Sequence, residues 1–273
     1  MTPISKAVNA ISKAKAILIA TGAGMGVDSG LPDFRGDEGF WIAYPPFREL
    51  GLSFVDLASP KWFHKNPSQA WGFYGHRFNL YAATKPNDGF SILKRWSDAK
   101  TYGSFVFTSN VDCHFQTSGF HEDRIVECHG SLRNLQCSAP CSDKTWPADG
   151  LVIEVDESTM LASEPFPLCP DCGAVARPNI LMFGDLQWIA SQTANQEDRY
   201  NEWIASVPRS DLVIIEIGAG TSIPTVRREM ESIAERRYAK LIRINPRESQ
   251  GPGESISIAA GGLAALRQIE ELL

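Results

Sequence analysis

Two close pairs of cysteines carry the most specific chemistry in this sequence. Cys137 and Cys141 form the first pair, and Cys169 and Cys172 form the second, in a Cys-Pro-Asp-Cys-Gly run. Four thiolates from two such pairs are typical of a tetrahedral Zn²⁺ site. Because the protein supplies all four ligands, no coordination position stays open for a substrate. We therefore expect a structural zinc ion rather than a catalytic one.

A glycine-rich stretch follows the first apolar run of the chain. Residues 16–20 are typical of a strand buried in a parallel sheet, and Gly22, Ala23 and Gly24 come directly after them. Glycines let the backbone bend sharply and approach a phosphate closely. The run 31–35 then places a carboxylate, an aromatic ring and a guanidinium side by side. We expect a nucleotide diphosphate site with a reactive end; a plain structural turn is the alternative.

Polar residues follow two further predicted strands. Residues 104–110 end in Asn110-Val111-Asp112, and residues 124–128 end in His129-Gly130. Open α/β sheets bind their ligands at the carboxyl ends of the strands. A lone histidine is usually structural, but a histidine beside a glycine at such an end is a candidate functional group. We expect these residues to lie near the glycine-rich turn.

The elements that must position these residues alternate between helices and strands. Beyond the strands already named, apolar runs at 211–217 and 240–244 predict two more, and helical spacing predicts helices over 3–14, 191–205 and 262–273. A second glycine-rich turn, 218–222, and Asn245 follow the last two strands. The alternation predicts an α/β fold with a parallel sheet. Residues 36–85 are rich in aromatics and prolines, and we expect short helices there, with most of the aromatics in a core.

Composition excludes several classes of protein. The chain of 273 residues has a net charge of −6, which disfavours a broad basic face for nucleic acid. No run approaches the roughly 18 apolar residues of a membrane span, and the N-terminus lacks the apolar centre of a signal peptide. We therefore expect a cytoplasmic protein without nucleic-acid or membrane partners. Cys113 and Cys128, outside the four-cysteine set, should be reduced.

Taken in order, these motifs resemble the sirtuin family, in its bacterial type, over nearly the whole chain. The matching residues are Gly22-Ala23-Gly24, Gly30-Leu31-Pro32-Asp33-Phe34-Arg35, Asn110-Val111-Asp112, His129-Gly130, the four cysteines, Arg177-Pro178-Asn179-Ile180, Phe183-Gly184, Gly220-Thr221-Ser222 and Asn245. The resemblance implies a Rossmann-like, doubly wound parallel sheet over residues 1–36, 86–130 and 178–273. It also implies a smaller domain made of a helical insert, 37–85, and a zinc-binding insert, 131–177.

The resemblance assigns roles to individual residues. NAD would be bound by Gly22, Ala23 and Gly24 at the diphosphate, by Asp33, Phe34 and Arg35 near the reactive ribose, by Asn110 and Asp112 at the nicotinamide carboxamide, and by Gly220, Thr221, Ser222 and Asn245 on the adenosine side. His129 would be the general base, with Asn110 as the second catalytic residue. The backbone of an acyl-lysine peptide would pair with the segment that contains Ile180, Leu181, Phe183 and Gly184.

The implied activity is a transferase reaction, NAD-dependent deacetylation or deacylation of protein lysine, with release of nicotinamide and O-acyl-ADP-ribose. Ser109, Gly26 and residues 113–116 depart from the pattern of most deacylating members. The run 108–112, followed by Phe115 and Gly119-Phe120, resembles the macrodomain-linked branch, which transfers ADP-ribose to proteins. That branch lacks the catalytic histidine, so His129 favours deacylation. ADP-ribosyl transfer and NAD hydrolysis remain the alternatives, with a non-catalytic NAD-binding scaffold as the rival from another class. The oligomeric state stays open.

Overall fold

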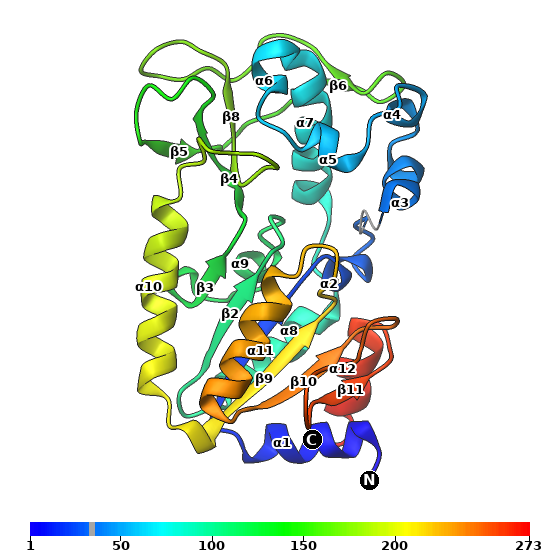
Figure 1. Ribbon diagram of the computed structural model, residues 1–273, viewed down its shortest axis with the longest axis vertical. Coiled ribbons are helices and arrows are strands. Elements are labelled where there is room, and N and C mark those ends of the chain that lie inside the picture. Colours follow the sequence, from blue (N-terminus) through cyan, green and yellow to red (C-terminus); the bar gives the residue numbers. More distant parts are fainter. Residues whose placement is uncertain (33–35) are drawn as a thin grey trace.

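A six-stranded parallel sheet is the framework of the molecule (Figure 1). The computed structural model describes residues 1–32 and 36–273. The strands stand in the order β11-β10-β9-β1-β2-β3, so the direction of the strand order reverses between β1 and β9. All neighbouring pairs are parallel, and the bounds are Ala16–Thr21 (β1), Ser104–Thr108 (β2), Ile125–Glu127 (β3), Leu212–Ile217 (β9), Lys240–Ile244 (β10) and Ile256–Ile258 (β11).

Helices cover both faces of this sheet, which explains why its strands are apolar on both sides. Successive side chains of a strand point to opposite faces. Ile17 and Ile19 accordingly pack with one group of helices, and Leu18 and Ala20 pack with the other. The first group is α1 (Pro3–Lys13), α8 (Asp88–Asp98), α9 (His114–Thr117) and α12 (Gly262–Glu270), and the second is α10 (Ser191–Ser206) and α11 (Thr225–Arg237). This is the doubly wound α/β arrangement that the sequence predicts.

A second hydrophobic core lies beyond the carboxyl ends of the parallel strands (Figure 1). Trp71 in the longest helix of this part donates a hydrogen bond from Nε1 to the carbonyl oxygen of Ala176 at 3.0 Å, which ties helices to strands. The buried aromatics include Phe40, Tyr44, Phe63 and Trp71, as expected. The helices are α3 (Gly36–Ala43), α4 (Pro45–Glu49), α5 (Phe54–Leu57), α6 (Trp62–Lys65) and α7 (Pro67–Ala83), and the strands are β4 (Gly130–Cys137), β5 (Thr145–Pro147), β6 (Val155–Asp156), β7 (Leu161–Ala162) and β8 (Ala176–Ile180).

The structure also shows where sequence patterns were incomplete. A helix of only four residues, α2 (Gly24–Val27), follows the first glycine turn. Strand β2 ends at Thr108, so Asn110 and Asp112 lie in the connection that follows it. Two short 3₁₀ turns, Glu122–Arg124 and Arg209–Asp211, precede β3 and β9. Within the described ranges, no helix has the length and apolar character that crossing a bilayer requires.

Candidate active site

The two glycine-rich turns meet where the strand order reverses. The backbone N–H of Gly22 donates to Ile217 O at 3.1 Å, and that of Gly24 donates to Gly218 O at 3.1 Å. Gly218 has φ +66°, and a Cβ added there would lie 2.5 Å from the Cα of Gly24. Ala23 is exposed at the outer side of the first turn. The turns therefore form a compact, open surface of backbone, which fits the close approach of a diphosphate.

Asn245 organises the second turn from inside. It is 1% exposed, its Nδ2 donates to Ala219 O at 3.0 Å, and its Oδ1 accepts from the backbone N–H groups of Arg247 and Glu248. The guanidinium of Arg227 donates to three carbonyls of the same region, those of Ala219, Glu248 and Gln250. Asn245 is thus occupied by the fold, and its influence on a ligand passes through the loops that it joins.

Glu248, in the connection after β10, contacts this turn, and no sequence pattern singled it out. Its carboxylate accepts from the backbone N–H of Thr221 at 3.2 Å and from the Thr221 hydroxyl. Gly220 lies beside it, since a Cβ there would be 3.6 Å from Glu248 Oε2. Ser222 is exposed next to this pair. The only signal in the sequence was its position three residues after Asn245 at the end of a predicted strand.

Hydrogen bonds across the ends of two strands, β1 and β2, position Asn110. Thr21 Oγ1 donates to Thr108 Oγ1 at 2.8 Å, and Thr108 Oγ1 accepts from the backbone N–H of Asn110 at 3.0 Å. The side-chain amide of Asn110 makes no hydrogen bond to the described residues. A half-buried amide with no partner among these residues is suited to a polar ligand. It therefore fits the carboxamide or hydroxyl groups of NAD.

Asp112 lies two residues further along the same connection. Its Oδ1 accepts from the backbone N–H of His114 at 3.0 Å, and its Oδ2 would lie 3.7 Å from a Cβ added at Gly26. Burial raises the pKa of Asp112, and His114 opposes this through its charge and its backbone hydrogen bond. The carboxyl group is therefore held in a poorly solvated place next to the first glycine turn.

Cys113 follows Asp112 directly, and its half-buried thiol is a poor nucleophile. Cys113 has φ +60°, its Sγ lies 3.3 Å from Ser131 Oγ, and the carboxylate of Glu127 is 3.9 Å away. Burial, with a smaller effect of the Glu127 charge, raises the pKa of Cys113 to about 12. Because the thiolate is the nucleophilic form, we assign no nucleophilic role to this cysteine.

His129 lies just beyond the carboxyl end of β3, the edge strand of the sheet. It follows β3, and its Nε2 lies 3.4 Å from Oγ1 of Thr225, the first residue of α11. Burial lowers the pKa of His129, and a hydrogen bond to the backbone of Ser109 opposes this. The imidazole is therefore neutral near pH 7 and adjoins the connection that carries Asn110 and Asp112. A neutral imidazole can accept a proton from a ligand hydroxyl.

The predicted peptide segment runs on from β8, beside His129. The backbone N–H of Leu181 donates to His129 O at 3.0 Å, and that of Phe183 donates to Ala58 O at 2.8 Å. These two donors are used within the protein. An added strand would need other backbone groups, such as those of Gly184, because the Met182 N–H also donates within the protein, to Asp185. Ile180 is buried, whereas Leu181 and Phe183 are 39% and 36% exposed.

A buried ion pair fixes the end of this segment. The guanidinium of Arg177 donates to both carboxylate oxygens of Asp185, at 2.7 and 2.9 Å, and their side chains are 1% and 0% exposed. Asp185 Oδ2 also accepts from the backbone N–H of Met182 at 3.4 Å. Arg177 thus lies beneath the segment and shapes it, instead of lining its outer surface.

The four predicted zinc ligands come together at the far end of β4. Their Sγ atoms all lie within 4.8 Å of one another, with 3.5 Å between Cys137 and Cys172 and 3.6 Å between Cys141 and Cys169. Zn–S bonds of about 2.3 Å require sulfur separations of about 3.8 Å in a tetrahedron. The donor set therefore fits Zn²⁺. The length of β4, roughly 20 Å, separates this cluster from His129.

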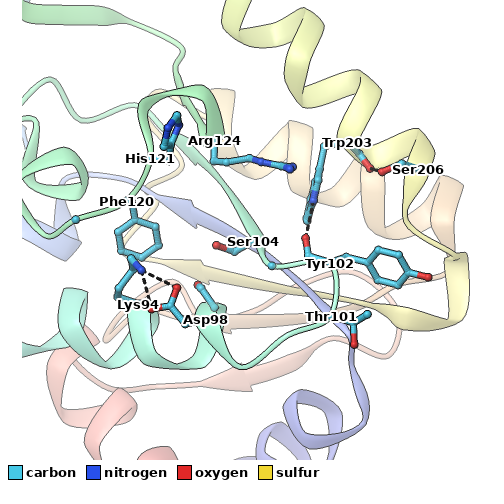
Figure 2. Close-up of a pocket in the computed structure, with 13 residues that line it drawn as sticks. Lys94, Asp98, Thr101, Tyr102, Ser104, Phe120, His121, Arg124, Trp203 and Ser206 are labelled. Atoms are coloured by element: carbon cyan, nitrogen blue, oxygen red, sulfur yellow. Dashed lines mark hydrogen bonds and ion pairs between the residues drawn. The ribbon is translucent and has the colours of Figure 1, made fainter.

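Asp33, Phe34 and Arg35, expected near the reactive ribose, fall outside the described residues. A cavity of about 680 Å³ opens at the amino ends of β2 and β3, among residues such as Lys94, Arg124 and Trp203 (Figure 2). None of the predicted site residues lines it. The candidate site is thus the convergence of strand ends, not this cavity.

Several known proteins resemble this chain in sequence and in fold. A family model described as the Sir2 family matches residues 22–224. The "NAD-dependent protein deacylase 1" of Archaeoglobus fulgidus is 29% identical over 248 residues, 89% of this chain and 86% of the relative. A "NAD-dependent protein deacylase" of Mycobacterium tuberculosis is 29% identical over 263 residues, 94% of this chain and 97% of the relative. A crystal structure of a Sir2 homologue–NAD complex shares the fold, with a TM-score of 0.73, 23% identity, and coverage of 98% of this chain and 93% of that one.

Proposed function

The chain belongs to the Sir2, or sirtuin, family, and we propose that it is an NAD-dependent protein lysine deacylase. The observation that carries this proposal is His129, a desolvated imidazole at a strand end beside the Asn110–Asp112 connection. A scaffold that only bound NAD would have no use for a base in this position. Relatives named as NAD-dependent protein deacylases support the same activity.

We propose that NAD lies along the carboxyl ends of the strands. Gly22, Ala23 and Gly24 would face the diphosphate, and Gly220, Thr221 and Ser222 would face the adenosine side. When bound, NAD supplies a glycosidic bond whose cleavage releases nicotinamide. Asn110 and Asp112 would bind the carboxamide, because one offers an unpaired amide and the other a poorly solvated carboxyl group. The proposal also includes Asp33, Phe34 and Arg35, which would bind NAD near the reactive ribose.

Other groups of the chain would bind the peptide and accept the proton. The segment with Leu181, Phe183 and Gly184 would bind the peptide backbone and bring the acyl-lysine oxygen to the ribose, a gain in proximity. His129 would take a proton from a ribose hydroxyl, which then attacks the acyl carbon. General-base catalysis of this kind is worth about 10²–10⁴-fold. One water would be consumed, so that the acyl group ends as an ester on ADP-ribose and the lysine leaves as its free amine.

The zinc cluster has a separate, structural part in this proposal. Its four protein ligands leave no open position for a reactant. We place residues 131–177 in a zinc-binding insert and 37–85 in a helical insert, with 1–36, 86–130 and 178–273 forming the NAD-binding domain. Four free cysteines arranged for zinc suit a reducing, cytoplasmic setting.

A product assay tests the proposal directly. Purified protein is incubated with NAD, with or without an acyl-lysine peptide, and all products are identified by mass spectrometry. We expect nicotinamide, free lysine peptide and O-acyl-ADP-ribose only when the peptide is present. Nicotinamide without peptide would instead indicate NAD hydrolysis, and ADP-ribose retained on a protein would indicate ADP-ribosyl transfer.

Replacing the proposed base sharpens the test. His129→Ala should lower the rate of deacylation by about 10²–10⁴-fold, because the proton acceptor is lost. His121→Ala is the matched control, since His121 is exposed near the amino end of β3, whereas His129 lies beyond its carboxyl end. Deacylation that survives His129→Ala at the control's rate would contradict the assignment of the base.

A further inference from the structure

The ring of His129 has two hydrogen-bond partners, Thr225 and the backbone of Ser109. Nε2 faces the hydroxyl of Thr225 at 3.4 Å, and the backbone of Ser109 makes the other hydrogen bond. A carbonyl oxygen only accepts, so it requires a proton on the ring nitrogen that faces it. With Nε2 turned to Thr225, that nitrogen is Nδ1. The neutral ring then has its free electron pair on Nε2.

We propose that Thr225 is a positioning residue for His129, which holds the imidazole through Nε2 and joins it to the second glycine-rich turn. This inference rests on the proposed role of His129 as the general base. Thr225 is suited to the task because a hydroxyl is both a donor and an acceptor. In the free protein it donates to Nε2 of the neutral ring; when a ribose hydroxyl takes over that electron pair, the threonine oxygen can accept from the N–H of the imidazolium.

The position of Thr225 in the fold gives this contact a second consequence. Thr225 begins α11, and the turn directly before it contains Gly220, Thr221 and Ser222. The same turn is tied to Glu248, and Arg227, two residues into α11, donates to Ala219 O. A hydroxyl at the start of α11 thus links the orientation of the base to the loops on the adenosine side.

Among the described residues, no charged group on the packed elements is a cause of the pKa shift of His129. Asp112 and Glu127, from the β2–α9 connection and β3, act on Cys113. Glu197 of α10 and Glu229 of α11 act on Cys128. The causes that shift the pKa of His129 are burial and the backbone of Ser109. The ring is therefore governed by solvation and by its two hydrogen-bond partners.

Nuclear magnetic resonance of the zinc-loaded protein labelled at histidine tests this inference. The His129 signals are those lost in His129→Ala. We expect the wild type to show a neutral ring protonated on Nδ1. In Thr225→Val the pKa of His129 should fall by about half to one unit, because a hydrogen bond to a charged group is stronger than one to a neutral group. Thr225→Ser should restore the wild-type value.

Kinetics provide the second arm. Thr225→Val should lower kcat about 5- to 20-fold and leave KM for NAD within about twofold, because the ring is misplaced while the cofactor still binds. Thr225→Ser should stay within about twofold of the wild type. Thr101→Val is the matched control, since Thr101 is exposed near the amino end of β2, at the other end of the strands from the site.

The two arms separate the inference from the proposed function. If the wild type does not deacylate, the proposed function fails, and the titration still decides whether Thr225 contacts the ring. The inference is overturned if Thr225→Val leaves the His129 pKa unchanged, if Thr225→Ser behaves like Thr225→Val, or if the titration shifts while kcat does not.

Discussion

At the scale of single residues, burial sets the protonation of His129. Burial disfavours the charged form of an imidazole, so the pKa of His129 lies below its ordinary value. The base is neutral above its pKa, and a lower pKa therefore extends the active form to lower pH. The contact with Ser109 moderates this shift, because it favours the charged ring.

A pH profile of the deacylation reaction checks this direction. The acidic limb of kcat/KM should fall below about pH 6.5, the ordinary pKa of histidine. Rates measured between pH 5 and pH 9 on one acyl-lysine peptide would locate it. A limb that lies clearly above about pH 6.5 would contradict a desolvated base.

Prediction from sequence succeeded best where local spacing carries the chemistry. The cysteine pairs Cys137/Cys141 and Cys169/Cys172 come together as their spacing predicts. Asn110, Asp112 and His129 follow strand ends as expected. Thr225 and Glu248 could not be found, because their partners, His129 and Thr221, are distant in sequence. Such contacts exist only once the sheet has assembled.

At the scale of elements, apolar patterns predicted the buried strands well and the antiparallel strands poorly. β1, β2, β9 and β10 are continuous apolar runs enclosed by helices. The pairing of β4 with β5 and β8 joins distant segments with mixed composition, and its register shifts between Ser131 and Leu135. No local period encodes such a pairing.

The zinc cluster is the element whose removal is easiest to measure. Cys169→Ser should lower the zinc content from about one ion per chain and destabilise the 131–177 segment, since structural zinc contributes roughly 10 kcal/mol in small zinc modules. Metal analysis and limited proteolysis would show this. Cys128→Ala, which removes a cysteine outside the cluster, should retain zinc. Full zinc content in Cys169→Ser would contradict the assigned ligand set.

At the scale of the whole molecule, the site depends on segments from both cores. Loops after β1, β2, β3 and β9 contribute the predicted NAD-facing residues, and the end of β8 contributes the peptide segment. The hydrogen bond from Phe183 N to Ala58 O joins that segment to the helical part. Substrate binding is thus expected between the two cores, with NAD on the larger one.

Binding of NAD should stabilise the folded chain as a whole. At a concentration of 100 times Kd, a ligand that binds only the folded state adds about 2.7 kcal/mol. For a protein of this size, this corresponds to a rise in Tm of roughly 5–10 °C. Thermal unfolding with increasing NAD measures the rise, and a Tm that stays constant at saturating NAD would contradict the proposed site.

Two glycine variants localise the effect. Gly218→Ala places a Cβ 2.5 Å from the backbone of Gly24 and should abolish the rise in Tm. Gly103→Ala is its matched control, because Gly103 also has a positive φ (+62°) but has nothing within 4 Å of an added Cβ. It should lose some stability and keep the response to NAD.

The contact between Gly218 and Gly24 has a consequence for how this sequence can diverge. A Cβ added at Gly22 would lie 2.8 Å from the Cα of Ala219, so the constraint acts from both turns. Neither turn can gain a side chain at these points unless the other backbone retreats. The two turns are about 200 positions apart in the chain, yet a change in one requires a compensating change in the other. A mutational library that varies one turn alone should return glycine at these positions, whereas flanking exposed positions such as Ala23 and Ser222 are free of this constraint.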